Sequence, residues 1–387
     1  MKLRTLGALL VLAGLAAGGP LGNQRVEMNP RSPDTPLKIV FRPYFCPLCL
    51  KEGRIEGPAQ KIVIMRMSPE GLAKAIGLEP GWIVIATPHF RILSTLRGSK
   101  VKFKNSAFAR ADLERLKTIF PKLTIGREGA YLNAHQRAHL YHIRAERIYD
   151  HFAALTDNHQ KYLGMHAPYH LMLFDDYADH HKFNDLFIGL ANDKAGLQYH
   201  IRAEPNFMVF TTAESQVARV KGKGDAIFNN HVIHNLAHNL VDGHGNYYRE
   251  TWGWLEEGIG HYYERRESPR FNTFCWSEGH PPQSFLKPDW KSVIYSIVRR
   301  GKDPPLGQWC EKLQPSGLTG VENGISWSIV KWLVETDPVR FTKMLRKLDD
   351  YKNKPSCAQC IQYAFGVSPS VLHQRWRQYV LEHYRRK

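Results

Sequence analysis

The spacing of three side chains constrains this chain of 387 residues more than any other feature of its sequence. His234 and His238 are four residues apart, so both imidazoles project from one face of a helix, about one turn apart. Eighteen residues separate His238 from Glu257, enough to end that helix, turn and begin another. Two imidazoles and a carboxylate suit tetrahedral zinc. We therefore predict a zinc site formed by His234, His238 and Glu257.

The second predicted helix carries further polar side chains near Glu257. His261 and Glu264 follow Glu257 by four and seven residues, on the same face, and are predicted to hydrogen-bond the ligands from behind. Glu256 lies about 100° around the helix and is expected to face away from the metal. His231 stays open as a fourth ligand, against the alternative of a histidine that only packs.

This pattern resembles the gluzincin metallopeptidases, in which H-E-x-x-H and a Glu eighteen residues beyond it hold zinc, and in which the second helix often reads W-L-x-E-G, as Trp254 to Gly258 do here. A weaker similarity to bacterial peptidase MA-like domains covers roughly residues 85–385. It rests on Pro88 to Ser94, Ile119-Phe120-Pro121, Trp327 to Leu333, and Phe365 to Ser368 leading to Trp376. The resemblance implies an α+β, zincin-like fold, with a small sheet, active-site helices and a helical C-terminal part.

One position departs from the family pattern. The Glu that follows the first His acts in the family as the general base, and here it is Asn235. An amide can orient a water molecule but cannot take its proton, and losing a positioned base removes about 10²–10⁴ of rate. Glu250 stays open as a substitute base. Candidates for stabilising the transition state are Tyr263, His280 and Tyr295, and none is assigned.

Three functions stay open. The leading interpretation is an exported, zinc-binding pseudo-peptidase that binds peptide or cell-envelope material. The first alternative is an active zinc peptidase that uses another base. The second is a basic protein that binds a polyanion, such as an anionic envelope polymer, beside a vestigial site. This last reading rests on a net charge of +17, from 53 Lys and Arg against 36 Asp and Glu. No basic run exceeds a few residues, so no specific nucleic acid is predicted.

The N-terminal residues have the pattern of a signal peptide. Lys2 and Arg4 precede an apolar stretch from Leu6 to Ala17, and small residues follow, so we expect cleavage after about residue 19. No later stretch is apolar for long enough to span a membrane, and an uncleaved N-terminal anchor is the alternative. The sequence thus predicts an extracytoplasmic protein, periplasmic or secreted.

The remaining chain divides by composition. Residues 20–36 are predicted to be a flexible leader, 37–104 a small β-rich module, and 105–387 the peptidase-like domain. The module's expected strands lie at 37–41, 62–65 and 83–86, where β-branched residues gather between turns. In the domain we expect helices at 109–120, 133–155 and 226–242, strands at 170–174 and 207–210, and mostly helix after residue 250.

Six cysteines suit an oxidising compartment. Cys46 and Cys49 form one C-x-x-C pair and Cys357 and Cys360 another, and we expect disulfides, with Cys275–Cys310 the natural remaining pair, although sequence does not fix connectivity. A row of three histidines on one helix face is expected to pack in the core, because no Cys or carboxylate stands beside it at ligand spacing. These are His135, His139 and His142.

Overall fold

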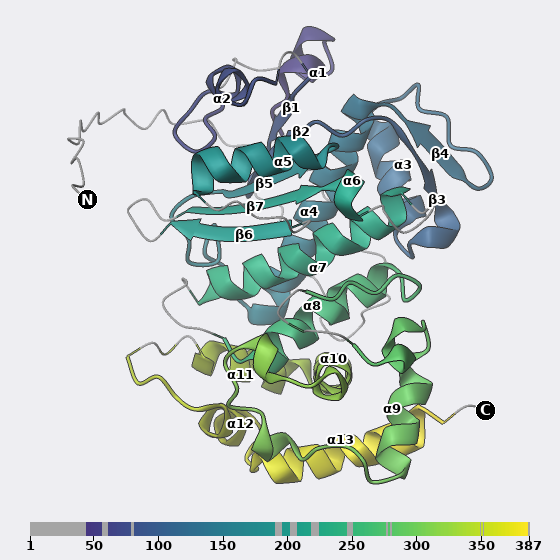
Figure 1. The fold of residues 1–387 in the computed structure, drawn as a ribbon, viewed down its shortest axis with the longest axis vertical. Helices are drawn as coiled ribbons and strands as arrows, with labels where there is room; N and C mark the ends of the chain where they lie inside the picture. Colours follow the sequence, from purple (N-terminus) through teal and green to yellow (C-terminus); the bar gives the residue numbers. More distant parts are fainter. Residues whose placement is uncertain are drawn as a thin grey trace.

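The computed structural model describes residues 44–55, 61–78, 81–189, 196–201, 207–217, 224–245, 251–275, 278, 281–348, 350 and 352–385. The predicted signal peptide and leader, the expected strand at 37–41, Glu250 and His280 lie outside these residues. The described chain has an α+β fold, in which a mixed sheet and a layer of helices lie above a helical C-terminal part (Figure 1).

The main sheet has five strands in the order β1-β2-β5-β7-β6. The strands are β1 (Ile83–Ala86), β2 (Phe90–Ser94), β5 (Tyr169–Phe174), β6 (Gly196–Ile201) and β7 (Phe207–Ala213). The three central strands run parallel, and β1 and β6 pair antiparallel at the edges. Every residue of β5 is buried, as expected for a strand covered on both faces. A separate ribbon pairs β3 (Ser99–Lys102) with β4 (Gly129–Leu132).

The strands predicted at 83–86, 170–174 and 207–210 are confirmed. The strand expected at 62–65 is wrong, because Ile64 makes only an isolated bridge to Met67 in a turn. Within the predicted β-rich module, β2 pairs with β5 of the following region, so the two regions share one sheet. The module also contains two helices, α1 (Pro47–Lys51) and α2 (Pro69–Ile76).

The predicted helices are confirmed within two residues at each end. They are α3 (Ala109–Ile119), α4 (Ala134–Thr156) and α7 (Gly224–His244). Helix α4 begins where the side chain of Asn133 accepts from the Gln136 backbone N–H and the Gln136 side chain accepts in return. It ends at Asp157, which adopts a left-handed conformation. Local capping therefore sets both ends of the longest described helix.

The helices that follow complete the fold. They are α5 (Tyr177–Phe183), α6 (Glu214–Val217), α8 (Gly253–Glu267), α9 (Trp290–Arg299), α10 (Gly320–Thr336), α11 (Pro338–Leu348), α12 (Cys357–Phe365) and α13 (Pro369–His383). Helix α7 contacts β7 on one side and α8 on the other, and α8 in turn contacts α10 (Figure 1). Helices α7 and α8 thus lie between the sheet and the helical C-terminal part. Among the described residues, no helix combines the length and apolarity that crossing a membrane requires.

A buried ion network ties α4 to α7. Arg137 and Arg144, both about 1% exposed, lie on α4, and Asp225 lies in the first turn of α7. Asp225 is 3.3 Å from Nη2 of Arg137 and 3.5 Å from Nη2 of Arg144. Arg137 also donates two hydrogen bonds to the carboxylate of Glu214 on α6, from Nη1 at 2.7 Å and from Nη2 at 2.8 Å. Charges this deeply buried are tolerated only because each has a partner.

Candidate metal centre

Helices α7 and α8 bring the three predicted ligands together. Glu257 Oε2 lies 3.5 Å from His234 Nε2 and 3.4 Å from His238 Nε2. All three side chains are buried, and the two imidazole rings lie 4.7 Å apart between centroids. One nitrogen of each ring and one carboxylate oxygen therefore converge on a single point, as the i, i+4 spacing on α7 and the start of α8 require.

The close approach of the two helices depends on glycines in α8. A Cβ atom at Gly260 would lie 2.5 Å from Nε2 of His238 and 3.0 Å from Cε1 of His234. On another face, a Cβ at Gly258 would lie 2.8 Å from the carbonyl oxygen of Ser326 on α10. Gly260 thus makes room for the two imidazoles, and Gly258 allows α8 to pack against α10.

A fourth side chain, which the sequence analysis assigned to a disulfide, completes the group. Cys275 Sγ lies 3.3 Å from His234 Nε2, and one ligand atom from each of Cys275, His234, His238 and Glu257 lies within 4.8 Å of the others. The pairing of Cys275 with Cys310 is therefore wrong. All six cysteines lie in the described chain and have free thiols. These four residues could hold a metal ion.

Carboxylates hold the far side of both imidazoles. Glu256 faces away from the ligand atoms, as expected, but its Oε1 lies 3.0 Å from Nδ1 of His238, the ring nitrogen opposite Glu257. Oε2 of Glu264 lies 3.5 Å from Nδ1 of His234. Such carboxylates orient metal-binding imidazoles. The role of Glu256 was missed, although its position directly before Glu257 places it on the neighbouring face of α8.

His261 links Glu264 to the chain segment that carries Cys275. Its Nδ1 is 2.8 Å from Glu264, and its Nε2 is 2.8 Å from Glu278. Burial lowers the pKa of His261, but Glu278 and Glu264 outweigh burial and raise it to about 10. Glu278 also accepts a hydrogen bond from the backbone N–H of Cys275, at 2.6 Å. The imidazolium and two carboxylates therefore fix the segment that presents the Cys275 thiol.

The buried carboxylate of Glu257 lacks ordinary partners. Neither of its oxygens has a hydrogen-bond partner among the described residues, and the imidazole nitrogens at 3.4 and 3.5 Å are its close polar neighbours. Burial raises the pKa of Glu257, but the charges of His238 and His234 outweigh burial and hold that pKa below its ordinary range. Burial and the charge of Glu257 raise the pKa of the Cys275 thiol. An anionic, unbonded carboxylate in this position fits a bound cation.

Asn235 takes no part in the group. Its side-chain amide donates to the backbone carbonyl of His231, one turn earlier on α7, at 2.9 Å. His231, the alternative fourth ligand, is in none of the metal-capable groups of the described residues. Of the residues considered for stabilising a transition state, Tyr263 is buried and lies 2.8 Å from His151 Nδ1. Tyr295 lines a pocket along α9 instead.

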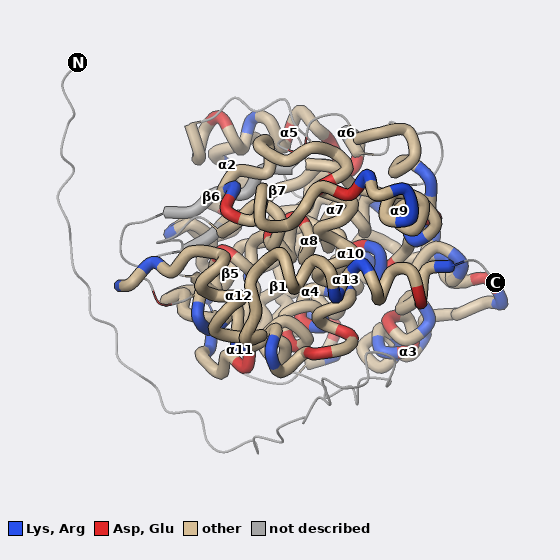
Figure 2. Tube along the Cα trace, turned by 90° about the horizontal axis from the view of Figure 1, so that it is seen from below, with Lys and Arg blue, Asp and Glu red and all other residues tan. Residues whose placement is uncertain are grey.

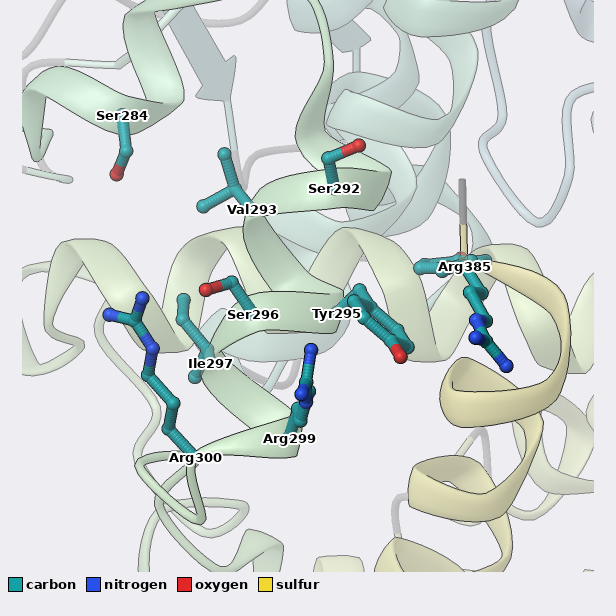
Figure 3. A pocket seen from close by; sticks show the side chains of 10 residues that line it. Ser284, Ser292, Val293, Tyr295, Ser296, Ile297, Arg299, Arg300 and Arg385 are labelled. Carbon is teal, nitrogen blue, oxygen red and sulfur yellow. The ribbon is translucent and has the colours of Figure 1, made fainter. Parts of the chain in front are cut away.

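That pocket, about 680 Å³ in volume, is an open depression with a basic rim. Figure 3 shows Arg299 and Arg300 at the end of α9 and Arg385 just beyond α13 around it. All three arginines are exposed. None of the metal-capable residues lines this pocket. It is therefore a feature separate from the group on α7 and α8.

No protein-family model matches the chain, and no curated protein is significantly similar to it in sequence.

Proposed function

We propose that this protein is a zinc-binding pseudo-peptidase related to the gluzincins, exported from the cytoplasm, that binds peptide or cell-envelope material rather than cleaving it. One observation carries the proposal: His234, His238, Glu257 and Cys275 direct their ligand atoms at one buried point. The position that supplies the base in such peptidases holds Asn235. The export part rests on the pattern of residues 1–19 alone.

The donor set favours zinc over other common metals. Imidazole and thiolate donors suit zinc, whereas calcium and magnesium prefer oxygen ligands. Tetrahedral zinc with Zn–N of about 2.0 Å and Zn–S of about 2.3 Å separates neighbouring ligand atoms by about 3.3–3.6 Å. Three of the separations between ligand atoms in the group are 3.3, 3.4 and 3.5 Å, and the others are at most 4.8 Å. The three separations of 3.3–3.5 Å match those between the ligand atoms of tetrahedral zinc, which supports the proposal.

Two features of these residues oppose hydrolysis. A zinc peptidase keeps one coordination position open for water or substrate, and when bound the zinc polarises the substrate carbonyl. Here Cys275 would fill that position. The amide of Asn235 is held by its own helix and cannot relay a proton to a leaving amine. A zinc site that has four protein ligands and no general base is expected to stabilise the fold, and the protein is expected to bind peptide without hydrolysing it.

The test is the metal content of the purified protein. We expect zinc in the wild type, and a loss of one zinc per chain in His238→Ala, because an imidazole ligand is removed. His159→Ala is the matched control, since His159 is exposed and pairs only with Asp157 among the described residues. Equal zinc content in wild type and His238→Ala contradicts the proposal.

Its second part is ligand binding. We expect the wild type to bind immobilised unfolded peptide or cell-envelope material without cleaving it. Because Asn235 cannot act as a base, mass spectrometry of the peptide after binding should find no new termini. Turnover at the rate of an ordinary peptidase, abolished by Glu257→Ala, contradicts this part and supports the alternative of an active enzyme with another base.

A second candidate function has its own support in the basic pocket. Lys and Arg are distributed widely over the chain, including α9 and the C-terminal end (Figure 2). Arg299, Arg300 and Arg385 surround the open depression and suit an anionic polymer. Binding of such a polymer weakens steeply as salt rises, because counterions are released on binding. Loss of that salt dependence in Arg299→Ala/Arg300→Ala, with zinc content unchanged, supports this second function.

A further inference from the structure

A second group of metal-ligating side chains lies outside the site on α7 and α8. Cys46 and Cys49 come from the N-cap and first turn of α1, and His135 and His139 come from the first two turns of α4. Cys46 Sγ lies 3.3 Å from His135 Nε2, and Cys49 Sγ lies 3.4 Å from His135 Nε2 and 3.3 Å from His139 Nε2. All four ligand atoms lie within 4.8 Å of one another.

These separations match tetrahedral zinc. With Zn–S of about 2.3 Å and Zn–N of about 2.0–2.1 Å, sulfur and nitrogen ligands lie about 3.5 Å apart. The two cysteines are spaced C-x2-C and the two histidines H-x3-H, which is the spacing of Cys2His2 zinc sites. Two sulfurs and two imidazole nitrogens at one point suit zinc rather than magnesium, calcium or manganese.

The surroundings suit a closed, structural site. Cys46, Cys49 and His139 have no exposed surface. The ring of Phe120 meets those of His135 and His139 at centroid distances of 5.2 and 5.3 Å. The ring of Tyr44 lies 4.8 Å from that of His139. These aromatic rings limit access of water to the ligand atoms, as in structural zinc sites.

His139 has a partner on Nδ1, the ring nitrogen that does not face the cysteines. Nδ1 of His142 lies 3.4 Å from Nδ1 of His139, so the third histidine of the row acts behind the second. These three histidines were predicted to pack in the core, because no cysteine stands near them in the sequence at ligand spacing. The fold supplies the cysteines from about ninety residues earlier.

We propose that Cys46, Cys49, His135 and His139 hold a structural zinc ion that ties the segment around α1 to α4. The segment also forms a backbone pair with the sheet, between Phe45 and Ala86 at 2.7 and 2.8 Å, and Arg54 lies over the ring of Phe120. A five-residue helix and one backbone bridge give little stability on their own. The zinc closes a covalent loop of nearly ninety residues, so it fixes the segment against the helical layer.

The experiment measures zinc stoichiometry in the full chain. The wild type is expected to contain two zinc ions, Cys49→Ser one, His238→Ala one, and the combined variant none. Cys357→Ser is the matched control, because it makes the same change in the second C-x-x-C pair, which lies in none of the metal-capable groups of the described residues. It should retain both ions.

X-ray absorption at the zinc edge separates this site from the one on α7 and α8. In His238→Ala the remaining zinc should have two sulfur ligands at about 2.3 Å, whereas in Cys49→Ser it should have one. In wild type the two ions together should have three sulfur ligands, a measurement that needs no variant to fold. If only the site on α7 and α8 binds no zinc, the wild type contains one zinc ion with two sulfur ligands, and His238→Ala retains that ion.

Two results overturn the inference. One is a wild-type protein whose only zinc is lost in His238→Ala. The other is a disulfide between Cys46 and Cys49, found by mass spectrometry of the native protein after alkylation without reduction.

Discussion

At the residue scale, Asn235 and Cys275 are the side chains by which the proposed zinc site would differ from one that hydrolyses peptides. Asn235 donates its amide to the His231 carbonyl and stands half-exposed on α7. Cys275 lies within 3.3 Å of a ligand nitrogen. Restoring the base alone leaves the thiol in the fourth position, and removing the thiol alone leaves no base. The two obstacles are therefore expected to act together.

The prediction for activity follows from this coupling. Asn235→Glu/Cys275→Ser should gain hydrolysis of unfolded peptide, by about 10²–10⁴ over wild type, because a positioned base contributes that much. One added methylene at the half-exposed position 235 needs little repacking. The measurement is cleavage of a fluorogenic peptide library by wild type, by each single variant and by the double variant.

Each single variant serves as a control for the double one. Asn235→Glu should gain little while Cys275 remains, and Cys275→Ser should gain little while Asn235 remains. Full activity in Asn235→Glu alone would show that Cys275 does not obstruct the site. If the double variant binds zinc and cleaves nothing, another required side chain is missing.

The residues of the site were predictable where spacing along one helix defines them. His234, His238 and Glu257 follow from the 3.6-residue period and the length of the connection between two helices. Cys275 does not, because its segment is held near the site by the contact between Glu278 and His261 of α8, which only the folded chain provides. A thiol's sequence position alone therefore cannot distinguish a disulfide partner from a metal ligand.

At the element scale, the packing of α8 against α7 decides whether the ligands meet. Gly260 faces both imidazoles, and a Cβ there would overlap the His238 ring at 2.5 Å. Gly260→Ala should therefore displace α8 from α7 and weaken zinc binding, although alanine favours helix. The measurement is zinc retained after dialysis against a weak chelator.

Gly245→Ala is the control for this prediction. Its added Cβ would lie 3.7 Å from the carbonyl oxygen of Asp242, an ordinary contact, at the end of α7. It should retain zinc like wild type. Equal retention in Gly260→Ala would show that the two helices are free to separate without losing the metal.

Elements differed in how far the sequence predicted them. The predicted bounds of α3, α4 and α7 were close. Helix α4 has a capping box at its start, and Pro121 follows the end of α3. The range 62–65 has strand-forming residues, but among the described residues it makes only the isolated bridge between Ile64 and Met67. Strand pairing is a property of the sheet. For the same reason, the pairing of β2 with β5, which lies outside the range predicted for the module, could not be read from the sequence.

At the scale of the whole molecule, buried charges hold the layers together. Burial raises the pKa of Asp225, but Arg144 and Arg137 outweigh burial and lower it. Asp225→Asn should reduce the free energy of unfolding by about 3–5 kcal/mol, because it leaves two buried guanidinium groups undercompensated. Because the folded pKa is depressed, this contribution is complete above the unfolded value of about 4 and is lost as the pH falls below it.

The measurement is urea unfolding at pH 7 and at pH 3.5, with Asp157→Asn as control. Asp157 forms an exposed ion pair with Arg346, so its loss should cost at most about 1 kcal/mol. Asparagine also tolerates the left-handed conformation of that position. A cost for Asp225→Asn as small as that for Asp157→Asn would show that the buried network contributes little to joining α4 and α7.

The last prediction concerns metal and stability over the whole chain. If the two proposed zinc sites form, one within the central helices and one at the segment around α1, each stabilises the folded state by an amount set by the concentration of free zinc. That amount is about 4 kcal/mol per site when zinc exceeds the dissociation constant a thousandfold. A strong chelator should therefore lower the Tm of wild type, and the Tm of Cys49→Ser and of His238→Ala by less. Calorimetry with chelator, and again after zinc is restored, measures this. Cys357→Ser should match wild type, and a Tm insensitive to chelator in every protein would show that neither group holds zinc as part of the fold.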